Sequence, residues 1–298
     1  MQSETTDPTR PHSARIHDYL LGGQDWYEVD RLAALSILDG WPVVATEARA
    51  NRDFLHRAVH TLAAERGVRQ FLDIGSGLPT TPNLHQVAQA AAAHARVVYV
   101  DNDPFVVEYA GRLLAATPQG SVSYLQADLR TDDVLGHPHV LNTLDLARPV
   151  AVSVVGLLQF MTEAEDPYAM IRRLLAPLAP GSYLVLSHVT SEHDTTGDAA
   201  RLIAAYGAGG VPLRPRSHHE IAQFFPGLHL LAPGLVAPEE WRPDGRSAQR
   251  GVGFFAGVGR KGGGDTVANR YAWGGAGAAG GYLEPPAKPG PGPARWGA

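Results

Sequence analysis

Short apolar segments alternate with helical segments from Val68 onward, and this alternation constrains the fold more than any other feature of the sequence. Because the apolar runs are largely continuous, they predict parallel strands that helices cover on both sides. The last two strands have no helix between them and predict an antiparallel pair at one edge. The expected fold class is α/β, a doubly wound, mostly parallel, seven-stranded, Rossmann-like sheet. The predicted strands are 68–74, 95–101, 121–128, 149–160, 181–189, 228–232 and 250–259.

Helical patterns separate these strands and also precede the first of them. Between the strands we expect helices at 82–93, 104–116, 166–178 and 195–206, a short helix or turn at 129–135, and a helix that opens with the capping box 217–220. Before the first strand, helical patterns occupy 13–21, 28–38 and 43–66, with glycine-containing breaks between them.

These patterns predict three parts of the chain. Residues 1–67 are expected to form an N-terminal arm and a helical cap, and residues 68–260 the sheet domain. After Arg260 the chain is dominated by Gly, Ala and Pro, with few large apolar side chains to offset the entropy of ordering. Residues 261–298 are therefore expected to form a disordered tail.

Composition excludes several classes of protein. The chain has no cysteine, which excludes disulfides, thiolate metal sites and cysteine nucleophiles. The lysines are Lys261 and Lys288 alone, so the sequence has no phosphate-binding Gly-Lys-Ser/Thr loop. His56 and His60 lie four residues apart, but no third ligand accompanies them and no metal site is expected.

Charge and hydropathy bear on partners and location. Formal net charge is -5, and no basic segment with interleaved aromatic residues is present, so no nucleic-acid partner is expected. No run of about 20 apolar residues and no signal-peptide pattern occurs, which predicts a cytoplasmic protein without a membrane partner.

The segment FLDIGSGLPTTPN joins the first strand to the following helix through a glycine turn. Gly75 and Gly77 leave bare backbone at the carboxyl end of that strand, where open parallel sheets bind ligands. Asp73, Asp101 and Asp128 each end one of the first three strands. Since parallel strands end at the same edge of a sheet, these acids are expected to line one elongated site.

Electrostatics favour S-adenosyl-L-methionine (SAM) over a dinucleotide as the ligand of this site. The dinucleotide fingerprint requires a third glycine at position 80, which is Thr80, and Asp73 would repel a pyrophosphate. SAM carries a cationic amino-acid end and no phosphate. Asp73 can then meet the ammonium group, Asp101 the ribose hydroxyls and Asp128 the adenine amino group.

The sequence resembles an actinomycete family of SAM-dependent methyltransferases whose substrates are largely unassigned. The motifs that carry the resemblance are FLDIGSGLPTTPN, VVYVDNDP, YLQADLR and YLVLSHVT, together with PHSARIHDYLLGGQDWYEVDR and EARANRDFLHRAV near the N-terminus. The resemblance covers about residues 10–260 and implies a class I methyltransferase fold with a helical cap, in which 68–260 bind SAM. The positions that it implies are Asp73, Gly75 and Gly77 at the methionine, Asp101 at the ribose, Asn102, Asp128 and Leu129 at the adenine, and Leu158 and Gln159 beside the sulfonium and the acceptor.

The N-terminal segment suggests further roles. Arg15 and Tyr19 lie on one face of the first helix, which is expected either to fold over the cofactor as a lid or simply to cover the sheet. Arg15 is a candidate to bind a carboxylate of SAM or of the acceptor. His188 and Tyr19 are the candidate general bases, followed by His17 and Asp25.

We therefore expect a SAM-dependent methyltransferase that acts on a small-molecule acceptor. Two alternatives stay open on the residues: a SAM-binding regulatory or scaffold protein without turnover, and an NAD-dependent oxidoreductase. The sequence carries no signal for the oligomeric state.

Overall fold

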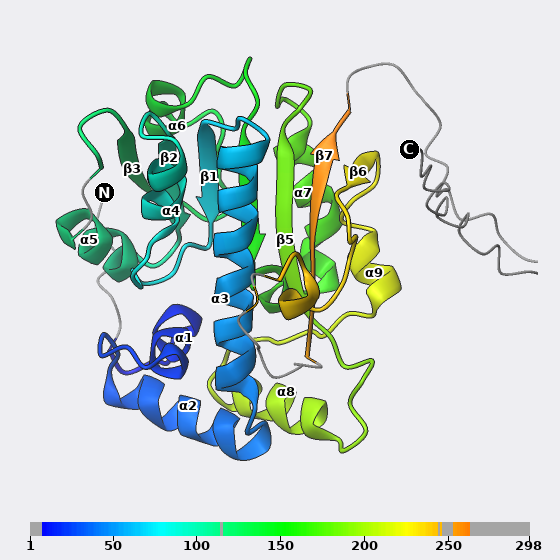
Figure 1. Ribbon diagram of the computed structural model, residues 1–298. Helices are drawn as coiled ribbons and strands as arrows, with labels where there is room; N and C mark the ends of the chain where they lie inside the picture. The colour runs from blue at the N-terminus through cyan, green and yellow to red at the C-terminus, as the bar shows by residue number, and fades with distance from the viewer. Residues whose placement is uncertain (1–7, 114–115, 244, 246–252, 263–298) are drawn as a thin grey trace, which may run out of the picture. The chain divides into compact units, whose positions relative to one another are not determined.

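Seven strands form one sheet in the order β3-β2-β1-β4-β5-β7-β6 (Figure 1). The first five strands pair in parallel, and β7 runs antiparallel to both β5 and β6. The predicted doubly wound sheet and its antiparallel edge are confirmed. The strands are Gln70–Ile74 (β1), Arg96–Asp101 (β2), Ser121–Gln126 (β3), Ala151–Val155 (β4), Tyr183–Val189 (β5), Leu228–Leu230 (β6) and Phe254–Lys261 (β7).

This computed structural model describes residues 8–113, 116–243, 245 and 253–262. The predicted tail lies outside the described residues from position 263 on, as do positions 1–7 of the N-terminal arm. The strand β7 continues through Lys261, the first residue assigned to the tail from the sequence. In the described residues, no helix is both long enough and apolar enough to cross a membrane.

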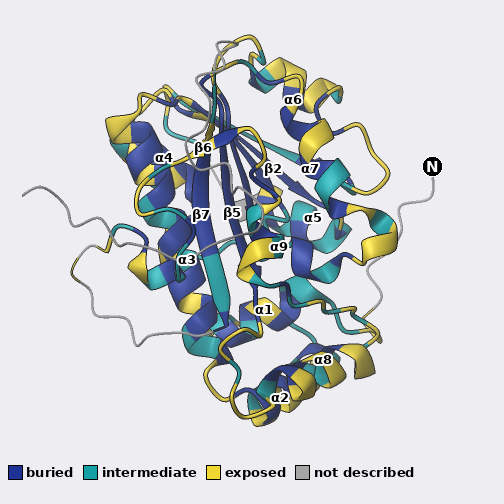
Figure 2. Ribbon diagram, turned by 90° about the vertical axis from the view of Figure 1, so that its right-hand side faces the viewer, coloured by how far each residue is buried: buried dark blue, intermediate teal, exposed yellow. Residues whose placement is uncertain are grey.

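The central strands β1, β2, β4 and β5 are buried on both faces, which explains why their sequences are largely apolar. On β1, Leu72 and Ile74 belong to one hydrophobic cluster and Phe71 to another on the opposite face, as the two-residue repeat of a strand requires. Figure 2 shows the buried strands between two layers of helices. The first cluster is covered by α6 (Pro138–Thr143), α7 (Pro167–Leu175) and α9 (His218–Ala222), and the second by α3 (Val44–His60) and α4 (Leu84–Ala91).

A helical cap lies across the end of the sheet where the parallel strands finish (Figure 1). It consists of α1 (Ser13–Leu21), α2 (Glu28–Gly40), α8 (Asp198–Ala208) and the first turns of α3, which enclose a third hydrophobic cluster. The helix α1 ends at Leu21, and Gly22 caps it in the left-handed region with a φ of 87°. The cap therefore includes a helix from the sheet domain, α8, which packs against α2.

Several element boundaries differ from the sequence prediction. The fourth strand was expected to reach residue 160, but β4 ends at Val155 because Gly156 turns the chain with a φ of 65° into a 3-10 turn at Leu158–Phe160. The six-residue helix α6 was not predicted. The remaining elements are α5 (Pro104–Leu113), a π-helical turn at Thr61–Glu65, and 3-10 turns at Glu163–Glu165 and Pro238–Glu240.

Candidate functional site

The glycine turn after β1 forms the floor of the site. Gly75 and Gly77 have φ values of 69° and 64°, in the left-handed region that glycine adopts without strain. A Cβ atom on Gly75 would lie 2.8 Å from a methyl carbon of Leu157, whereas a Cβ on Gly77 would meet nothing within 4 Å. The space above Gly77 is therefore open to a ligand, while Gly75 lets Leu157 pack against the turn.

Two buried carboxylates flank this turn. Asp73 accepts a hydrogen bond from the hydroxyl of Ser153 on β4, and burial raises its pKa to about 6. Asp101 accepts from the Gly77 N–H at 2.9 Å and from the Asp103 N–H at 3.0 Å, and burial raises its pKa as well. A carboxylate has about four acceptor positions, so Asp101 can hold the turn and still accept from a ligand.

The third predicted acid, Asp128, lies beyond β3 and is half-buried. Its oxygens accept from Arg130 Nε at 2.8 and 3.0 Å and from Asn102 Nδ2 at 3.3 Å. The hydrogen bond to Arg130 is the main cause of the lowered pKa of Asp128. The acid thus borders the site as one half of an ion pair, and a ligand amino group would share it with Arg130.

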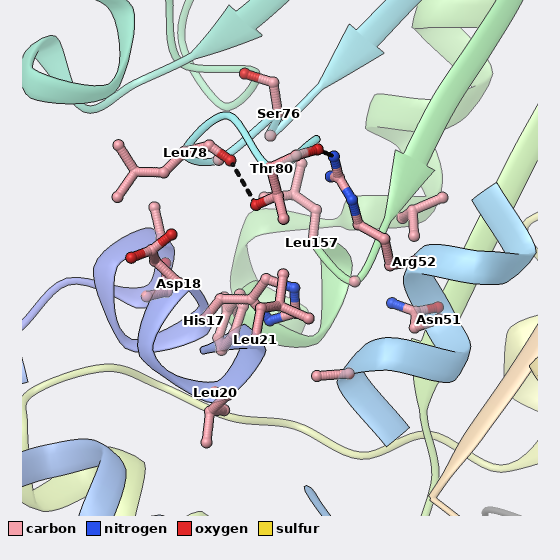
Figure 3. Close-up of a pocket in the computed structure, with 18 of the residues that line it drawn as sticks. His17, Asp18, Leu20, Leu21, Asn51, Arg52, Ser76, Leu78, Thr80 and Leu157 are labelled. Atoms are coloured by element: carbon pink, nitrogen blue, oxygen red, sulfur yellow. Dashed lines mark hydrogen bonds between the residues drawn. The ribbon is translucent and has the colours of Figure 1, made fainter. Parts of the chain in front are cut away.

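Two neighbouring pockets open on either side of the contact between Gly75 and Leu157. The outer pocket, of about 790 Å³, is lined by Asn102, Asp128 and Leu129 among others. The cap pocket, of about 150 Å³, lies between α1, α3 and the turn after β1 (Figure 3). The residues that line both are His12, Ser13, Gly75, Asp101, Asn102, Leu157 and Phe160.

The cap pocket contains buried polar atoms without partners. Among the residues that the structure describes, Asn51 Oδ1, Gln159 Oε1 and Arg52 Nε have no hydrogen-bond partner. Asn51 and Gln159 are each only 5% exposed. An unpaired buried polar atom is unfavourable, and all three residues that carry one line the cap pocket, which is therefore polar on the side of α3 and of the turn after β4.

Arg52 of α3 and His17 of α1 both line this pocket. Arg52 donates to the carbonyl oxygens of Thr80 and Pro82, and burial lowers its pKa. His17 is exposed to the pocket, and desolvation within the pocket lowers its pKa, with a smaller contribution from the charge of Arg52. His17, one of the base candidates from the sequence, is therefore a neutral imidazole at pH 7.

Arg15, Tyr19 and His188 do not lie where their predicted roles would require. Arg15 borders the outer pocket, but its guanidinium is buried and donates to Asp30 at 2.8 Å and to Asp103 at 3.0 Å. Tyr19 packs edge-on against Trp26 and lines neither pocket.

His188 also lies away from both pockets. It is fully buried, with Nδ1 2.8 Å from the Val189 carbonyl oxygen and Nε2 2.7 Å from Arg216 Nη1. Burial lowers its pKa to about 3. Neither this histidine nor Tyr19 is positioned to remove a proton from a molecule in the cap pocket.

Sequence reasoning missed Asn51 and Arg52. The available signal was their position on α3, where Val44, Ala48, Asn51, Arg52 and Leu55 recur at helical spacing and line one pocket. Polar residues inside an otherwise apolar helical stripe indicate a buried polar site.

A basic groove lies at the opposite end of the sheet, where the parallel strands begin. Arg96 opens β2, and Arg260 of β7 pairs with the first residue of β5. None of the residues described there as lining the groove is a carboxylate. The arginines that line it are Arg66, Arg69, Arg96, Arg148 and Arg260, and His94 lies among them.

Comparison with known proteins identifies the family. A family model described as S-adenosyl methyltransferase matches residues 1–262. A DUF574 family protein from Streptomyces avermitilis MA-4680 is 43% identical, with a TM-score of 0.82, and the match covers 86% of this chain and 99% of that one. A "putative methyltransferase" from Thermobifida fusca YX is 36% identical, with a TM-score of 0.79 and coverage of 86% and 96%. No curated protein matches. The chain belongs to the S-adenosyl methyltransferase family, a group of SAM-dependent enzymes with the class I methyltransferase fold.

Proposed function

We propose that this SAM-dependent methyltransferase acts on a small-molecule acceptor bound in the cap pocket. The observation that carries the proposal is that the two pockets adjoin at Gly75 and Leu157 and share lining residues on both sides of the glycine turn. A ligand can extend from the outer pocket past the glycine turn and present one end to a second molecule in the cap pocket. The enclosure of that second compartment by α1, α3 and Tyr206 of α8 favours a compact acceptor over a nucleic acid.

The residues of the site fit the cofactor. The outer pocket offers Asn102, Asp128 and Leu129 for an adenine, and Asp101 keeps acceptor positions for ribose hydroxyls. The open space over Gly77 and the carboxylate of Asp73 suit an amino-acid end. SAM, when bound, supplies an electrophilic methyl group on its sulfonium.

Arg52 is the better candidate than Arg15 for the carboxylate of the methionine. Arg15 already donates hydrogen bonds to Asp30 and Asp103, whereas Arg52 lies beside the glycine turn and its Nε has no hydrogen-bond partner among the described residues. The chain's own contribution to the reaction is then to bind, align and desolvate the two reactants, since methyl transfer to an already nucleophilic atom needs no strong base. The comparisons offer no support for the regulatory protein or the oxidoreductase.

Calorimetric titration with S-adenosylhomocysteine tests the assignment of the site. Asp101→Asn removes the charge of the proposed ribose ligand and should weaken binding by about 10- to 100-fold, because a hydrogen bond to a charged group contributes about 1.5–3 kcal/mol. Asp145→Asn is the matched control, since Asp145 is an exposed acid outside both pockets that accepts from the Ala147 N–H. Equal affinities for the wild type and Asp101→Asn would contradict the assignment.

A further inference from the structure

The basic groove concentrates positive charge on a protein whose formal net charge is -5. Its five arginines are all exposed, and within the described part of the chain none of them pairs with a carboxylate. The acids closest to them along the chain do not line the groove: Glu65 pairs with Arg242 at 2.8 Å, and Asp145 accepts from the Ala147 N–H at 3.0 Å. Because a cleft lined by one sign of charge focuses its field, the groove attracts an anion.

The arginines come from neighbouring strands. Arg96 opens β2, Arg69 directly precedes β1, and Arg148 lies shortly before β4. Arg260 of β7 pairs with Tyr183, the first residue of β5. In the sheet these strands follow one another as β2-β1-β4-β5-β7. Since neighbouring strands lie about 4.8 Å apart, the arginines form a row about 19 Å long across the sheet.

Two of these arginines have defined positions in the groove. Arg69 Nη1 donates to the carbonyl oxygens of Ala63 at 2.7 Å and Val68 at 2.9 Å. Arg260 Nη2 lies 3.7 Å from the place where a Cβ on Gly181 would stand, which puts this guanidinium beside the turn that precedes β5. An arginine has five N–H donors, so Arg69 keeps those on Nε and Nη2 for a ligand.

The shape and chemistry of the groove favour a particular anion. The planar fork of arginine matches phosphate oxygens, which it can bind through two parallel hydrogen bonds. A single phosphate ion is much shorter than the row of arginines, whereas a chain of phosphates can contact several of them. Among the described residues that line the groove, the only Phe, Tyr or Trp is Tyr183, which is just 5% exposed, so no such ring can stack on a nucleobase. The groove, at about 430 Å³, is also too small to receive a nucleic-acid duplex.

We propose that the basic groove binds a chain of directly linked phosphate groups, either an inorganic polyphosphate or the phosphate end of a nucleotide. The bound phosphates offset the mutual repulsion of the arginines, and binding to the folded protein alone stabilises it. The groove and the candidate SAM site lie at opposite ends of the sheet, so each can be tested without the other.

Calorimetric titrations at low salt with inorganic tripolyphosphate, orthophosphate and UTP test this assignment. The wild type should bind tripolyphosphate at least about tenfold more tightly than orthophosphate, because more arginines reach it. Arg148→Gln and Arg260→Gln should each weaken tripolyphosphate about three- to tenfold, and the double variant about 10- to 100-fold. Arg172→Gln is the matched control, since Arg172 is an exposed arginine of α7 outside the groove.

The same titrations distinguish the two sources of phosphate. Equal affinities for tripolyphosphate and UTP would show that the phosphate chain is sufficient, whereas a higher affinity for UTP would assign the groove to a nucleotide. Circular dichroism establishes that the variants are folded. Separate titration of each variant with S-adenosylhomocysteine should give the wild-type affinity, and a failure of the wild type to bind it would refute the proposed function but not the anion site.

Four results would overturn the assignment of the groove. Tripolyphosphate could fail to bind, or it could bind no more tightly than orthophosphate. Arg172→Gln could weaken tripolyphosphate as much as the groove variants do, which would attribute binding to the general surface charge. A thymidine oligonucleotide with as many phosphates as tripolyphosphate could bind more tightly, which would assign the groove to single-stranded nucleic acid instead.

Discussion

Replacement of Arg15 by methionine should destabilise the protein strongly without removing a cofactor ligand. Arg15 joins three segments: it lies on α1 and donates to Asp30 of α2, to Asp103 after β2 and to the Arg10 carbonyl oxygen. Arg15, Asp30 and Asp103 are all at most 5% exposed. Methionine has a similar length but leaves two buried carboxylates without their cation.

The magnitude follows from the partners that remain. Breaking a buried ion pair by removing one member costs about 3–5 kcal/mol. Asp30 keeps the N–H groups of His12 and Tyr27, and Asp103 keeps that of Phe105, so we expect the lower end, about 3 kcal/mol. For a domain of this size that corresponds to a fall in melting temperature of roughly 6–12 °C.

Urea unfolding followed by circular dichroism, together with calorimetry of S-adenosylhomocysteine, separates the two roles considered for Arg15. Arg31→Met is the matched control, because Arg31 pairs with Glu28 at the exposed surface of α2 and should contribute less than about 0.5 kcal/mol. A loss of stability below about 1 kcal/mol combined with a more than tenfold loss of affinity would refute the structural role. It would restore Arg15 as a ligand of the cofactor carboxylate.

Three further predictions concern other parts of the fold. Burial lowers the pKa of His188 to about 3 in the folded protein, below its unfolded value near 6.5. The neutral histidine therefore contributes stability above pH 6.5, and this contribution falls as the pH falls. Between pH 7.5 and 5 the free energy of unfolding should decrease by about 2 kcal/mol less in His188→Gln than in the wild type, as measured by urea titration. Lys261 Nζ donates to the Leu175, Ala176 and Leu178 carbonyl oxygens at 2.7–2.8 Å, and Lys261→Met should cost about 1–2 kcal/mol in thermal unfolding; no change would exclude this capping role. In the basic groove the arginines repel one another, so added NaCl should raise the melting temperature of the wild type. The increase should be smaller in Arg148→Gln, which removes one of these charges. The same salt dependence of the melting temperature in both proteins would contradict the repulsion.

The parts of the site that depend on local sequence could be predicted. Gly77 and Asp101 follow from the strand-helix alternation, because glycine and acid at successive strand ends must meet along one edge of a parallel sheet. The structure brings them into a direct hydrogen bond. The sequence also favours SAM correctly, since Thr80 in place of the third glycine and the presence of Asp73 can both be read from the sequence without a structure.

The parts that depend on distant segments could not be predicted. Arg15 looks like a free cation on a helix face, and only the packed cap brings Asp30 and Asp103 to it. The fourth strand was predicted too long because Leu157 and Leu158 continue the apolar pattern after Gly156, although the chain has already turned. Apolar residues that line a pocket and apolar residues that fill a strand have the same composition.

The position of β7 has a consequence for synthesis of the chain. This strand pairs with every residue of the fully buried β5, yet Phe254 follows Val189 by 65 positions. At about 5–20 residues per second, a ribosome leaves the edge of β5 unpaired for several seconds. An apolar strand with open hydrogen-bonding groups is a template for aggregation. Nascent chains that terminate before position 254 should therefore need a chaperone to stay dispersed, whereas chains that extend through position 261 can close the sheet themselves.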